Sequence, residues 1–356
     1  MKVWIDILTP KQVLFFQPLI QELEKNGYYT LITSRHYREV ELLIKRFNIK
    51  ADFIGEHGGD NLYQKLIASS KRIIQLAEIV SEKNPNCSIS FSSPECARVS
   101  HGLGIKHICI SDSPHAESVS KLTIPLSHYL LTPWIIPISE WVKYGISKER
   151  IIKYKALDPV VWIKRRKQIN RLELNLDKSK KTITIRLPEV KASYLLHINK
   201  NAYMDLLNKI TSQFINCNIV VLCRYDEQIK EIEAHYGSKL IIPKNGFDGI
   251  NLLIHTDVFI GMGGTMNTES ALLGIPTISA YPEKSHYVEN YLIKKGLIIK
   301  PQSIDNMIKT LEKLLENEKY KSHLKKKAGN ILKRMEDPIV KILTIIDSII
   351  KGKLNQ

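Results

Sequence analysis

Short β-branched segments alternate with amphipathic segments along almost the whole chain, and this alternation constrains the fold more than any other feature. It is typical of βαβ units, in which helices connect parallel strands. The expected strands of the first half are Val3–Leu8, Tyr29–Ser34, Ala51–Gly55, Cys87–Phe91, Lys106–Ser111 and Tyr129–Thr132. Those of the second half are Thr182–Leu187, Asn218–Arg224, Leu240–Ile242, Val258–Gly261, Pro276–Ala280 and Leu297–Lys300. A helical tail follows, at Ile304–Leu315, Lys319–Arg334 and Pro338–Ile350.

Two helices of the first half are expected at Leu14–Asn26 and Leu62–Ser81. In the second of these, apolar side chains recur at helical spacing and predict a buried face, with Arg72 away from it. The residues of that face are Leu62, Leu66, Ile73, Ala77 and Val80.

The alternation stops between Asp158 and Lys181, where basic and polar residues accumulate as in a linker. We therefore predict an α/β protein with two doubly wound domains. The predicted ranges are 1–160 for the first domain, 161–181 for the linker, 182–336 for the second domain and 337–356 for a C-terminal helix that packs back on the first domain. Because ligands bind beyond the carboxyl ends of such strands, two facing domains would form a shared cleft.

The composition restricts the class of protein and of partner. Hydrophobic residues make up 44% of the 356 residues and charged residues 25%, which excludes a disordered or fibrous chain. The net charge of +16 favours anionic partners. Nucleic acid is not expected, because no helix-turn-helix, zinc-finger or RNP-like motif occurs.

The compartment follows from cysteines and hydropathy. The five cysteines have neither metal-ligand spacing nor a disulfide pattern, which indicates a reducing environment. No apolar run reaches the roughly 20 residues that span a bilayer. We therefore expect a cytoplasmic protein, either free or bound peripherally at the inner face of the plasma membrane.

The most informative segment is 258–277, in which a strand ends in Gly261-Met262-Gly263-Gly264 and a helix begins near Thr265. Glycines allow a sharp turn and a close approach of ligand to backbone, and the N–H groups at a helix start attract phosphate. Glu269 would repel phosphate but suits the two hydroxyl groups of a ribose. The segment therefore indicates a nucleoside diphosphate site, although an ordinary strand–helix turn has the same glycines. It matches neither G-x-G-x-x-G nor a Walker loop, which disfavours dinucleotide oxidoreductases and ATPases.

This segment resembles the second domain of GT-B nucleotide-sugar glycosyltransferases, in particular the MurG type and the related UDP-N-acetylglucosamine 2-epimerases. The matching residues are Gly263-Gly264-Thr265, Glu269, Gly274-Ile275-Pro276 and Tyr281-Pro282. Over nearly its full length, the chain is identified as a member of the largely archaeal, GT-B-like domain-of-unknown-function 354 family. The supporting segments are Trp4-Ile5-Asp6-Ile7, Phe15-Phe16, Pro18-Leu19-Ile20, His57-Gly58-Gly59, Ser93-Pro94-Glu95, Gly102-Leu103-Gly104-Ile105 and Ser111-Asp112. The resemblance implies a GT-B fold of two facing Rossmann-like domains.

It also implies that the second domain binds a UDP-sugar donor. The expected substrate-binding residues are Gly263, Gly264, Thr265, Met266, Glu269, Arg186, Asp248, Gly249 and Asn290. The Gly-Gly-Thr turn would hold the pyrophosphate and Glu269 the ribose, while Arg186 would face a phosphate and Asp248-Gly249 the base. In GT-B proteins the helix start and basic groups stabilise the leaving diphosphate, and the chain has no Asp-x-Asp motif. Neither a metal nor another cofactor is therefore expected.

The first domain would hold the acceptor and the group that takes the proton of its hydroxyl. The catalytic candidates are His115, Asp112, Glu95 and His57, all at predicted strand ends. Asp112 and His115 form the preferred pair, because a carboxylate orients an imidazole; Glu95 also suits a helix start, and a loop histidine is often only solvated. Related sequences carry Asn-Pro-Pro-His-Val-His after the first strand, where this chain has Thr-Pro-Lys-Gln-Val-Leu at 9–14 and no histidine. The epimerase signature His-Val-Glu-Ala-Gly is also absent.

We therefore expect a glycosyltransferase that moves a sugar, N-acetylglucosamine-like, from a UDP-sugar to an acceptor in glycan or glycolipid synthesis. The basic clusters Lys164–Lys167 and Lys325–Lys327 suit either a solvated surface or an anionic membrane carrying a polyprenyl-phosphate-linked acceptor. Two alternatives remain. One is a UDP-N-acetylglucosamine 2-epimerase-like enzyme, and the other is a non-catalytic GT-B protein that binds a nucleotide sugar.

Overall fold

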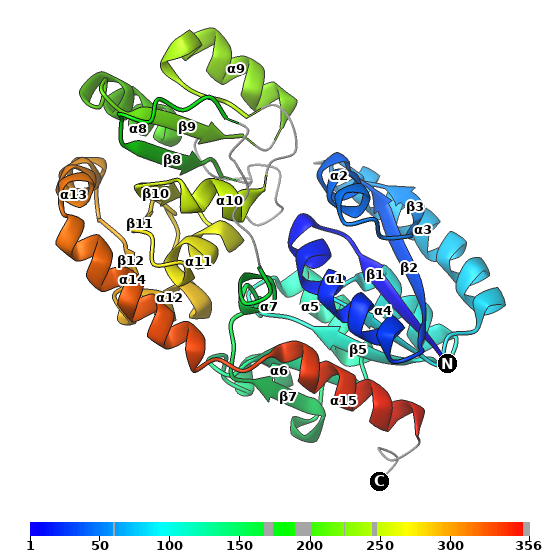
Figure 1. Cartoon of the computed structure of the whole chain (residues 1–356). Coiled ribbons are helices and arrows are strands. Elements are labelled where there is room, and N and C mark those ends of the chain that lie inside the picture. The colour runs from blue at the N-terminus through cyan, green and yellow to red at the C-terminus, as the bar shows by residue number, and fades with distance from the viewer. Residues whose placement is uncertain (60, 167–173, 189–200, 224, 244–247, 352–356) are drawn as a thin grey trace. The chain divides into compact units, whose positions relative to one another are not determined.

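The structure is a computed structural model that describes residues 1–59, 61–166, 174–188, 201–223, 225–243 and 248–351. The chain divides into two compact units (Figure 1). Unit 1 comprises Met1–Lys164 and Met335–Gln356, and unit 2 comprises Arg165–Arg334. Several predicted positions lie outside the described residues: 167–173 of the linker, 189–200 of the second domain, Arg224, and 352–356 of the last helix.

Unit 1 is built on a parallel sheet with the strand order β3-β2-β1-β4-β5-β6-β7. The strands are β1 (Lys2–Ile7), β2 (Tyr29–His36), β3 (Asp52–Glu56), β4 (Cys87–Ser90), β5 (Lys106–Ile110), β6 (Tyr129–Pro133) and β7 (Ile151–Tyr154). The helices are α1 (Pro10–Lys25), α2 (Arg38–Arg46), α3 (Leu62–Lys83), α4 (Pro94–Gly102), α5 (Glu117–Thr123), α6 (Ser139–Val142), α7 (Val160–Ile163) and α15 (Pro338–Ile350). The strand order reverses between β1 and β4, so the loops after these strands lie side by side at the carboxyl edge.

The last helix of the chain, α15, belongs to unit 1 and packs against α1. Its isoleucines face the core, and Ile342 and Ile346 are fully buried. Lys341 Nζ donates to the backbone carbonyl of Lys153 at 2.7 Å. This helix is strongly apolar on one side, so burial against α1 stabilises it in place.

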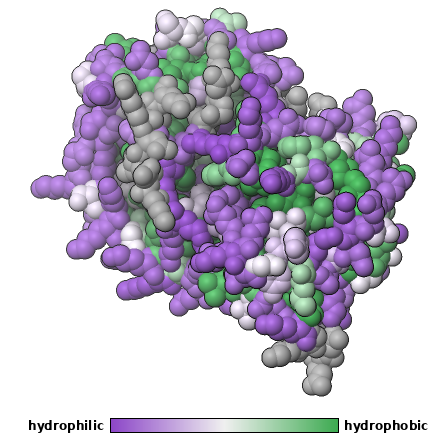
Figure 2. Space-filling view, turned by 45° about the vertical axis from the view of Figure 1, so that its right-hand side comes forward, coloured by the Kyte–Doolittle hydropathy of each residue, from purple (hydrophilic) through white to green (hydrophobic). Residues whose placement is uncertain are grey.

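Helix α3 is not buried as its apolar pattern predicts. Leu62 and Leu66 have exposed fractions of 69% and 64%, whereas Arg72 is almost completely buried. Val80 is buried as predicted, and Ile73 and Ala77 pack against the same core cluster. The prediction was wrong for Leu62 and Leu66 and for Arg72, which is buried because it forms an ion pair with Asp6 inside the unit. On the side of the molecule that Figure 2 shows, hydrophobic areas lie between hydrophilic ones.

Unit 2 is built on a smaller parallel sheet with the order β12-β11-β10-β8-β9. The strands are β8 (Thr182–Arg186), β9 (Asn218–Leu222), β10 (Val258–Gly261), β11 (Thr277–Ser279) and β12 (Ile298–Ile299). The helices are α8 (Asn201–Gln213), α9 (Asp226–Tyr236), α10 (Gly249–Ile254), α11 (Thr265–Leu272), α12 (Tyr287–Lys294), α13 (Ile304–Glu316) and α14 (Glu318–Lys333). The order reverses between β8 and β10, and this places Arg186 beside Gly261.

Two local differences from the sequence expectations have simple causes. The predicted strand Leu240–Ile242 is only an isolated bridge between Ile241 and Val220. Strand β7 was not expected, because its sequence, Ile-Ile-Lys-Tyr, is short and is followed closely by polar residues. The α/β class of both units is confirmed, and within the described residues every helix is too short or too polar to span a lipid bilayer.

Candidate functional site

The glycine turn of unit 2 connects β10 to α11 at the carboxyl edge of its sheet. Gly263 and Gly264 have φ angles of +96° and +92°, a region in which other residues are strained. A Cβ atom at Gly263 would lie 2.9 Å from Cδ2 of Tyr281. Gly264 is the N-cap residue of α11 and supplies no side-chain cap, so the first N–H groups of the helix have no side-chain acceptor from that position. Such a helix start attracts an anion.

Arg186 and Glu269 flank this turn. Arg186 ends β8, where it pairs in register with Gly261, and its backbone carbonyl accepts from the N–H of Met262 at 3.1 Å. Its guanidinium donates to the carbonyl of Cys223 at 3.2 Å. Glu269 lies on α11 and is buried, with an exposed fraction of 4%. The structure therefore brings Arg186 to the beginning of the glycine turn.

The other predicted donor-site residues have structural partners. Asp248 caps α10 by accepting from the N–H of Asn251 at 3.0 Å, and it also pairs with Arg166 at 2.8 Å. Met266 packs into small apolar clusters beside α10, and a Cβ at Gly249 would lie 3.8 Å from its Cε. Asn290 is exposed on α12, and its Nδ2 donates to the carbonyl of Ser285 at 2.6 Å.

Unit 1 carries a charged cluster at its carboxyl edge that the sequence analysis did not identify. Lys11 lies in the first turn of α1, and its Nζ is 2.6 Å from Asp112 Oδ2 and 2.7 Å from Asp158 Oδ2. Ser113 donates to Asp112 Oδ1 at 2.8 Å, and the hydroxyl of Tyr154 donates to Asp158 Oδ1 at 2.6 Å. The side chains of Lys11 and Asp112 are 18% and 20% exposed, and that of Asp158 is 1% exposed. The cluster thus has one end at the surface and one buried end.

The two carboxyl groups of this cluster titrate in opposite directions. Burial raises the pKa of Asp158 to about 7, and the negative charge of Asp112 adds to the rise while Lys11 opposes it. Burial by itself would raise the pKa of Asp112, but the charge of Lys11 and the hydrogen bonds from Lys11 and Ser113 together lower it to about 2. Burial lowers the pKa of Lys11, but both carboxylates together raise it above its ordinary value. At neutral pH, Asp112 is therefore ionised and Asp158 is close to half-protonated.

The predicted catalytic residues of unit 1 occupy three different places. Asp112 lies in the cluster with Lys11. His115 is exposed on the turn before α5, and His57 is exposed after β3, where its ring stacks on Tyr37 with centroids 5.5 Å apart. Lys11 was visible in sequence only as the residue in a loop where relatives have histidines. Asp158 lies where the predicted alternation stops, just before the predicted linker 161–181, and nothing local indicates that the fold brings it to Lys11 on α1.

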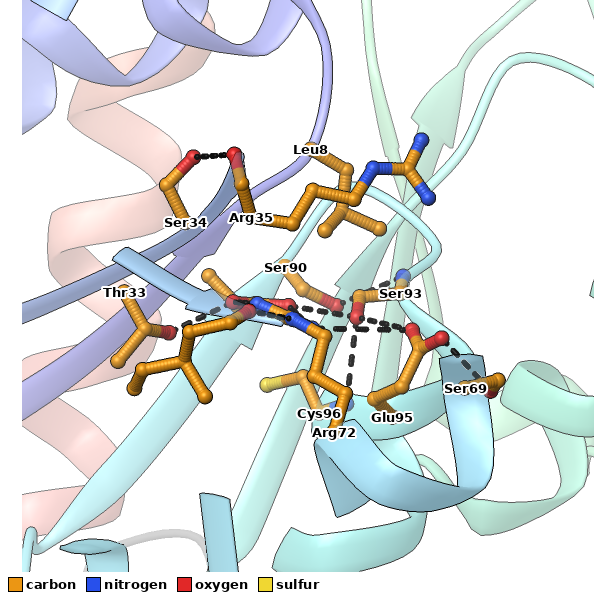
Figure 3. A network of polar contacts seen from close by, with 12 residues as sticks. Leu8, Thr33, Ser34, Arg35, Ser69, Arg72, Ser90, Ser93, Glu95 and Cys96 are labelled. Carbon is orange, nitrogen blue, oxygen red and sulfur yellow. Dashed lines mark hydrogen bonds and ion pairs between the residues drawn. The ribbon is translucent and has the colours of Figure 1, made fainter. Parts of the chain in front are cut away.

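Glu95 belongs to a buried polar network that Figure 3 shows together with Ser69, Ser93 and Arg72. The same network includes Asp6, to which Ser93 donates at 2.6 Å. Ser69 donates to Glu95 Oε1 at 2.7 Å, and Ser93 donates to Glu95 Oε2 at 3.3 Å. Arg72 binds Asp6 through both terminal nitrogens, at 3.0 and 2.6 Å. This network connects β1, α3 and the start of α4. Glu95 therefore takes part in hydrogen bonds that hold these elements together.

Comparison with a family model decides the relationship of the chain. The model described as "Protein of unknown function (DUF354)" matches residues 1–349. The chain belongs to this family. An uncharacterized protein of Methanocaldococcus jannaschii is 35% identical to this chain over 353 residues. The match covers 94% of this chain and 95% of that protein.

Solved structures show which fold this DUF354 protein has. The UDP-GlcNAc 2-epimerase of Neisseria meningitidis bound to UDP-GlcNAc matches with a TM-score of 0.74 and 17% identity, over 99% of this chain and 100% of that one. Spinosyn forosaminyltransferase matches with a TM-score of 0.63 and 13% identity, over 98% and 99%. The predicted GT-B fold and the predicted family are therefore confirmed. Both structural relatives are enzymes by name, one an epimerase and one a glycosyltransferase.

The DUF354 chain thus has two carboxyl edges with different chemical capacities. The edge of unit 2 offers backbone N–H groups and Arg186, which are suited to phosphate oxygens. The edge of unit 1 offers a carboxyl pair that exchanges a proton near neutral pH. Among the described residues, no three histidine, cysteine or acidic side chains converge as a metal site.

Proposed function

We propose that this protein is a glycosyltransferase that transfers a sugar from a UDP-sugar to an acceptor hydroxyl. The proposal rests above all on the glycine turn between β10 and α11, where Gly263 and Gly264 have left-handed backbone angles and the helix start lacks a side-chain cap. The diphosphate would bind to these N–H groups, with Arg186 beside them and Glu269 accepting from the ribose. The structural relative from Neisseria meningitidis, which is bound to UDP-GlcNAc, supports a nucleotide sugar as ligand.

The proposed proton acceptor is the carboxyl pair of unit 1. Asp112 is ionised and reaches the surface, so it would accept the proton of the acceptor hydroxyl. A carboxylate of low pKa is a weak base alone, but Asp158 shares the Lys11 ammonium group with it and has a pKa near neutrality. The proton would therefore pass from Asp112 to Asp158 while Lys11 holds both groups in place. His115, His57 and Glu95 are not required in this scheme.

A specific observation also favours a second candidate, a UDP-sugar 2-epimerase. A named 2-epimerase shares the fold over the entire chain. Epimerisation at a carbon next to the anomeric centre also needs a group that removes and returns a proton, which the carboxyl pair of unit 1 would supply. The two candidates differ in whether an acceptor is needed.

Incubation of the purified protein with UDP-N-acetylglucosamine separates these candidates. A transferase releases UDP only when an acceptor is added, and the acceptor gains the mass of the sugar. An epimerase changes the nucleotide sugar without any acceptor, which NMR of the sugar protons detects. If neither product forms but UDP-sugar binds, the protein is a binding protein, and the catalytic proposal is wrong.

Glu269 tests the nucleotide site directly. Replacing it with alanine removes the proposed ribose acceptor, and we expect a loss of about 1.5–3 kcal/mol in UDP affinity, the scale of a hydrogen bond to a charged group. Calorimetry with UDP and with UMP measures the loss. Glu312→Ala is the comparison variant, because Glu312 is an exposed acidic residue on α13 of the same unit, outside the proposed nucleotide site. Unchanged UDP affinity in Glu269→Ala would contradict the assignment of the ribose.

A further inference from the structure

Arg35 is a cation without a partner at the carboxyl edge of unit 1. It follows the buried end of β2, directly after Ser34. Its Nε atom is buried, and none of the described residues forms a hydrogen bond with it. Figure 3 shows its side chain extended beside Leu8, with no dashed line to its guanidinium. Besides burial, the pKa of Arg35 is affected by Glu95, Arg72 and Asp6.

The neighbouring Arg72, in contrast, has hydrogen-bond acceptors for all three nitrogens of its guanidinium group. Its Nε donates to the carbonyl of Ile54 at 2.8 Å, and its two terminal nitrogens donate to Asp6. Burial lowers the pKa of Arg35, whereas the pairing with Asp6 raises that of Arg72 against the effect of burial. Partial burial of a guanidinium group that makes no hydrogen bonds lowers the stability of the folded protein. A protein therefore seldom keeps such a group unless it binds a ligand or a partner.

The acidic groups near Arg35 are already engaged. Asp6 accepts four hydrogen bonds, two from Arg72 and one each from Thr33 and Ser93, both at 2.6 Å. Glu95 accepts from Ser69 and Ser93. The described residues therefore supply no acceptor for the fork of Arg35, which leaves it available to a ligand.

The position in the sheet is that of a ligand site. Strand β2 adjoins β1, and the strand order reverses between β1 and β4. Ligands of doubly wound sheets bind at the carboxyl edge near such a reversal. A planar guanidinium fits the oxygens of a phosphate or a carboxylate in a bidentate manner.

We propose that Arg35 binds an oxyanion, a phosphate ester or a carboxylate, of a ligand held at the carboxyl edge of unit 1. This site is separate from the glycine turn of unit 2. If the proposed glycosyl transfer is correct, on which this last step rests, the oxyanion belongs to the acceptor. The negative charge of Glu95 nearby keeps the affinity for a small anion modest, and it disfavours a second negative charge on the ligand.

The experiment uses the full chain in chloride buffer at pH 7.5 and constant ionic strength, with UDP at a fixed saturating concentration. Dimethyl phosphate and acetate, both monoanions at pH 7.5, are the two probes, and thermal unfolding and calorimetry follow their binding. The variants are Arg35→Gln, Arg35→Lys, which keeps the charge but not the fork, and Arg98→Gln. Arg98 is exposed on α4 and serves as the matched control.

We expect at least one probe to bind saturably to wild type and to Arg98→Gln. The same probe should bind to Arg35→Gln with at least tenfold lower affinity, and to Arg35→Lys with an intermediate affinity. The probe that binds identifies the ligand as a phosphate ester or a carboxylate. Without probe, Arg35→Gln should unfold no earlier than wild type, because it loses an unpaired charge. Equal binding by Arg35→Gln and wild type, or no saturable binding by wild type, overturns the proposal.

Two further results keep this proposal apart from the proposed function. A marked destabilisation of Arg35→Gln without probe shows that Arg35 is structural and overturns the oxyanion site. UDP titration of the same variants reports on unit 2 alone. Failure of UDP binding combined with Arg35-dependent probe binding contradicts the UDP-sugar proposal but supports the oxyanion site.

Discussion

The carboxyl edges of the two units differ in what they present to a ligand. In unit 1 the edge carries charged side chains, with Lys11 between Asp112 and Asp158 and the unpaired Arg35 on β2. In unit 2 the corresponding edge is a backbone turn, Gly263-Gly264, that leads into α11. One architecture therefore supports two kinds of chemistry. Ionisable side chains can move protons, whereas backbone N–H groups hold phosphate without titrating.

This difference makes the two edges sensitive to different changes. A cluster of buried charges depends on each of its members and on pH. A turn with positive φ angles depends on the absence of a Cβ atom and hardly on pH. The predictions below test that contrast, beginning with the largest expected effect.

Lys11→Met should destabilise the protein by about 3–5 kcal/mol at pH 7.5, because it leaves two carboxyl groups in a buried site without their cation. Urea unfolding measures the loss. Adding Asp158→Asn to this variant should restore a large part of the stability, since only one carboxylate then remains. A Lys11→Met protein as stable as wild type would show that the cluster is not energetically coupled.

The pH dependence of stability should reflect Asp158. Its pKa of about 7 in the folded protein exceeds the ordinary 3.8, so its stabilisation is full below about pH 4 and is lost as the pH rises through 7. The stability of wild type relative to Asp158→Asn should therefore fall by about 3 kcal/mol between pH 4 and 7, at about 1.4 kcal/mol per pKa unit. Urea unfolding across this range measures the difference.

His107 affects the same measurement in the opposite direction. Burial lowers the pKa of His107 to about 3, so the folded protein loses stability as the pH falls from 6.5 toward 3. Both proteins contain His107, and its effect cancels in their difference. A difference that does not change with pH would contradict the assigned titration of Asp158.

Gly263→Ala should cost about 1–3 kcal/mol of stability, because alanine is strained at a positive φ and its Cβ meets the ring of Tyr281. It should also weaken UDP binding, since the turn has to shift. Gly329→Ala is the control within unit 2, where a Cβ would meet no atom within 4 Å in helix α14. That change should stabilise by about 0.5–1 kcal/mol. If Gly263→Ala and Gly329→Ala had similar effects, the glycine turn would not need the absence of a Cβ atom more than a helical position does.

Asp248→Ala should have the smallest effect, about 1 kcal/mol, from the loss of the α10 cap. Asp248→Asn keeps a cap and should recover part of this loss. Thermal unfolding measures both, and calorimetry measures UDP affinity. If Asp248→Asn abolishes UDP binding while the protein stays folded, a charged side chain is essential in unit 2 as well, and the contrast between the edges is weaker than proposed.

Much of the architecture was predictable because its signals are local. The strand at 258–261 and the helix at 338–350 agree with the expected bounds, and α13 and α14 differ by one residue at their ends. A run of β-branched residues or a helical apolar stripe carries its own information within a few turns. The isolated bridge at Ile241 and the exposed Leu62 show where tertiary packing overrides such local preference.

The charged cluster was not predictable in the same way. Asp112 was a candidate because it follows a strand, but its partners in the structure include Lys11 and Asp158. These three residues come from the first turn of α1, the loop after β5 and the segment before α7. The sheet order β1-β4-β5 brings Asp112 near Lys11, and the contact of α7 with α1 brings Asp158 to the same place.

The sequence by itself determined the alternating α/β order, the glycine turn that leads into α11 and the family to which the chain belongs. Each of these depends on residues that are neighbours along the chain. Only the tertiary structure decided which charges meet: Lys11 between two carboxylates, Arg72 buried against Asp6, and Arg35 with no partner in the described part of the chain. The physical reason is that electrostatic energy depends on distance in space and on burial, and neither is encoded by position along the chain.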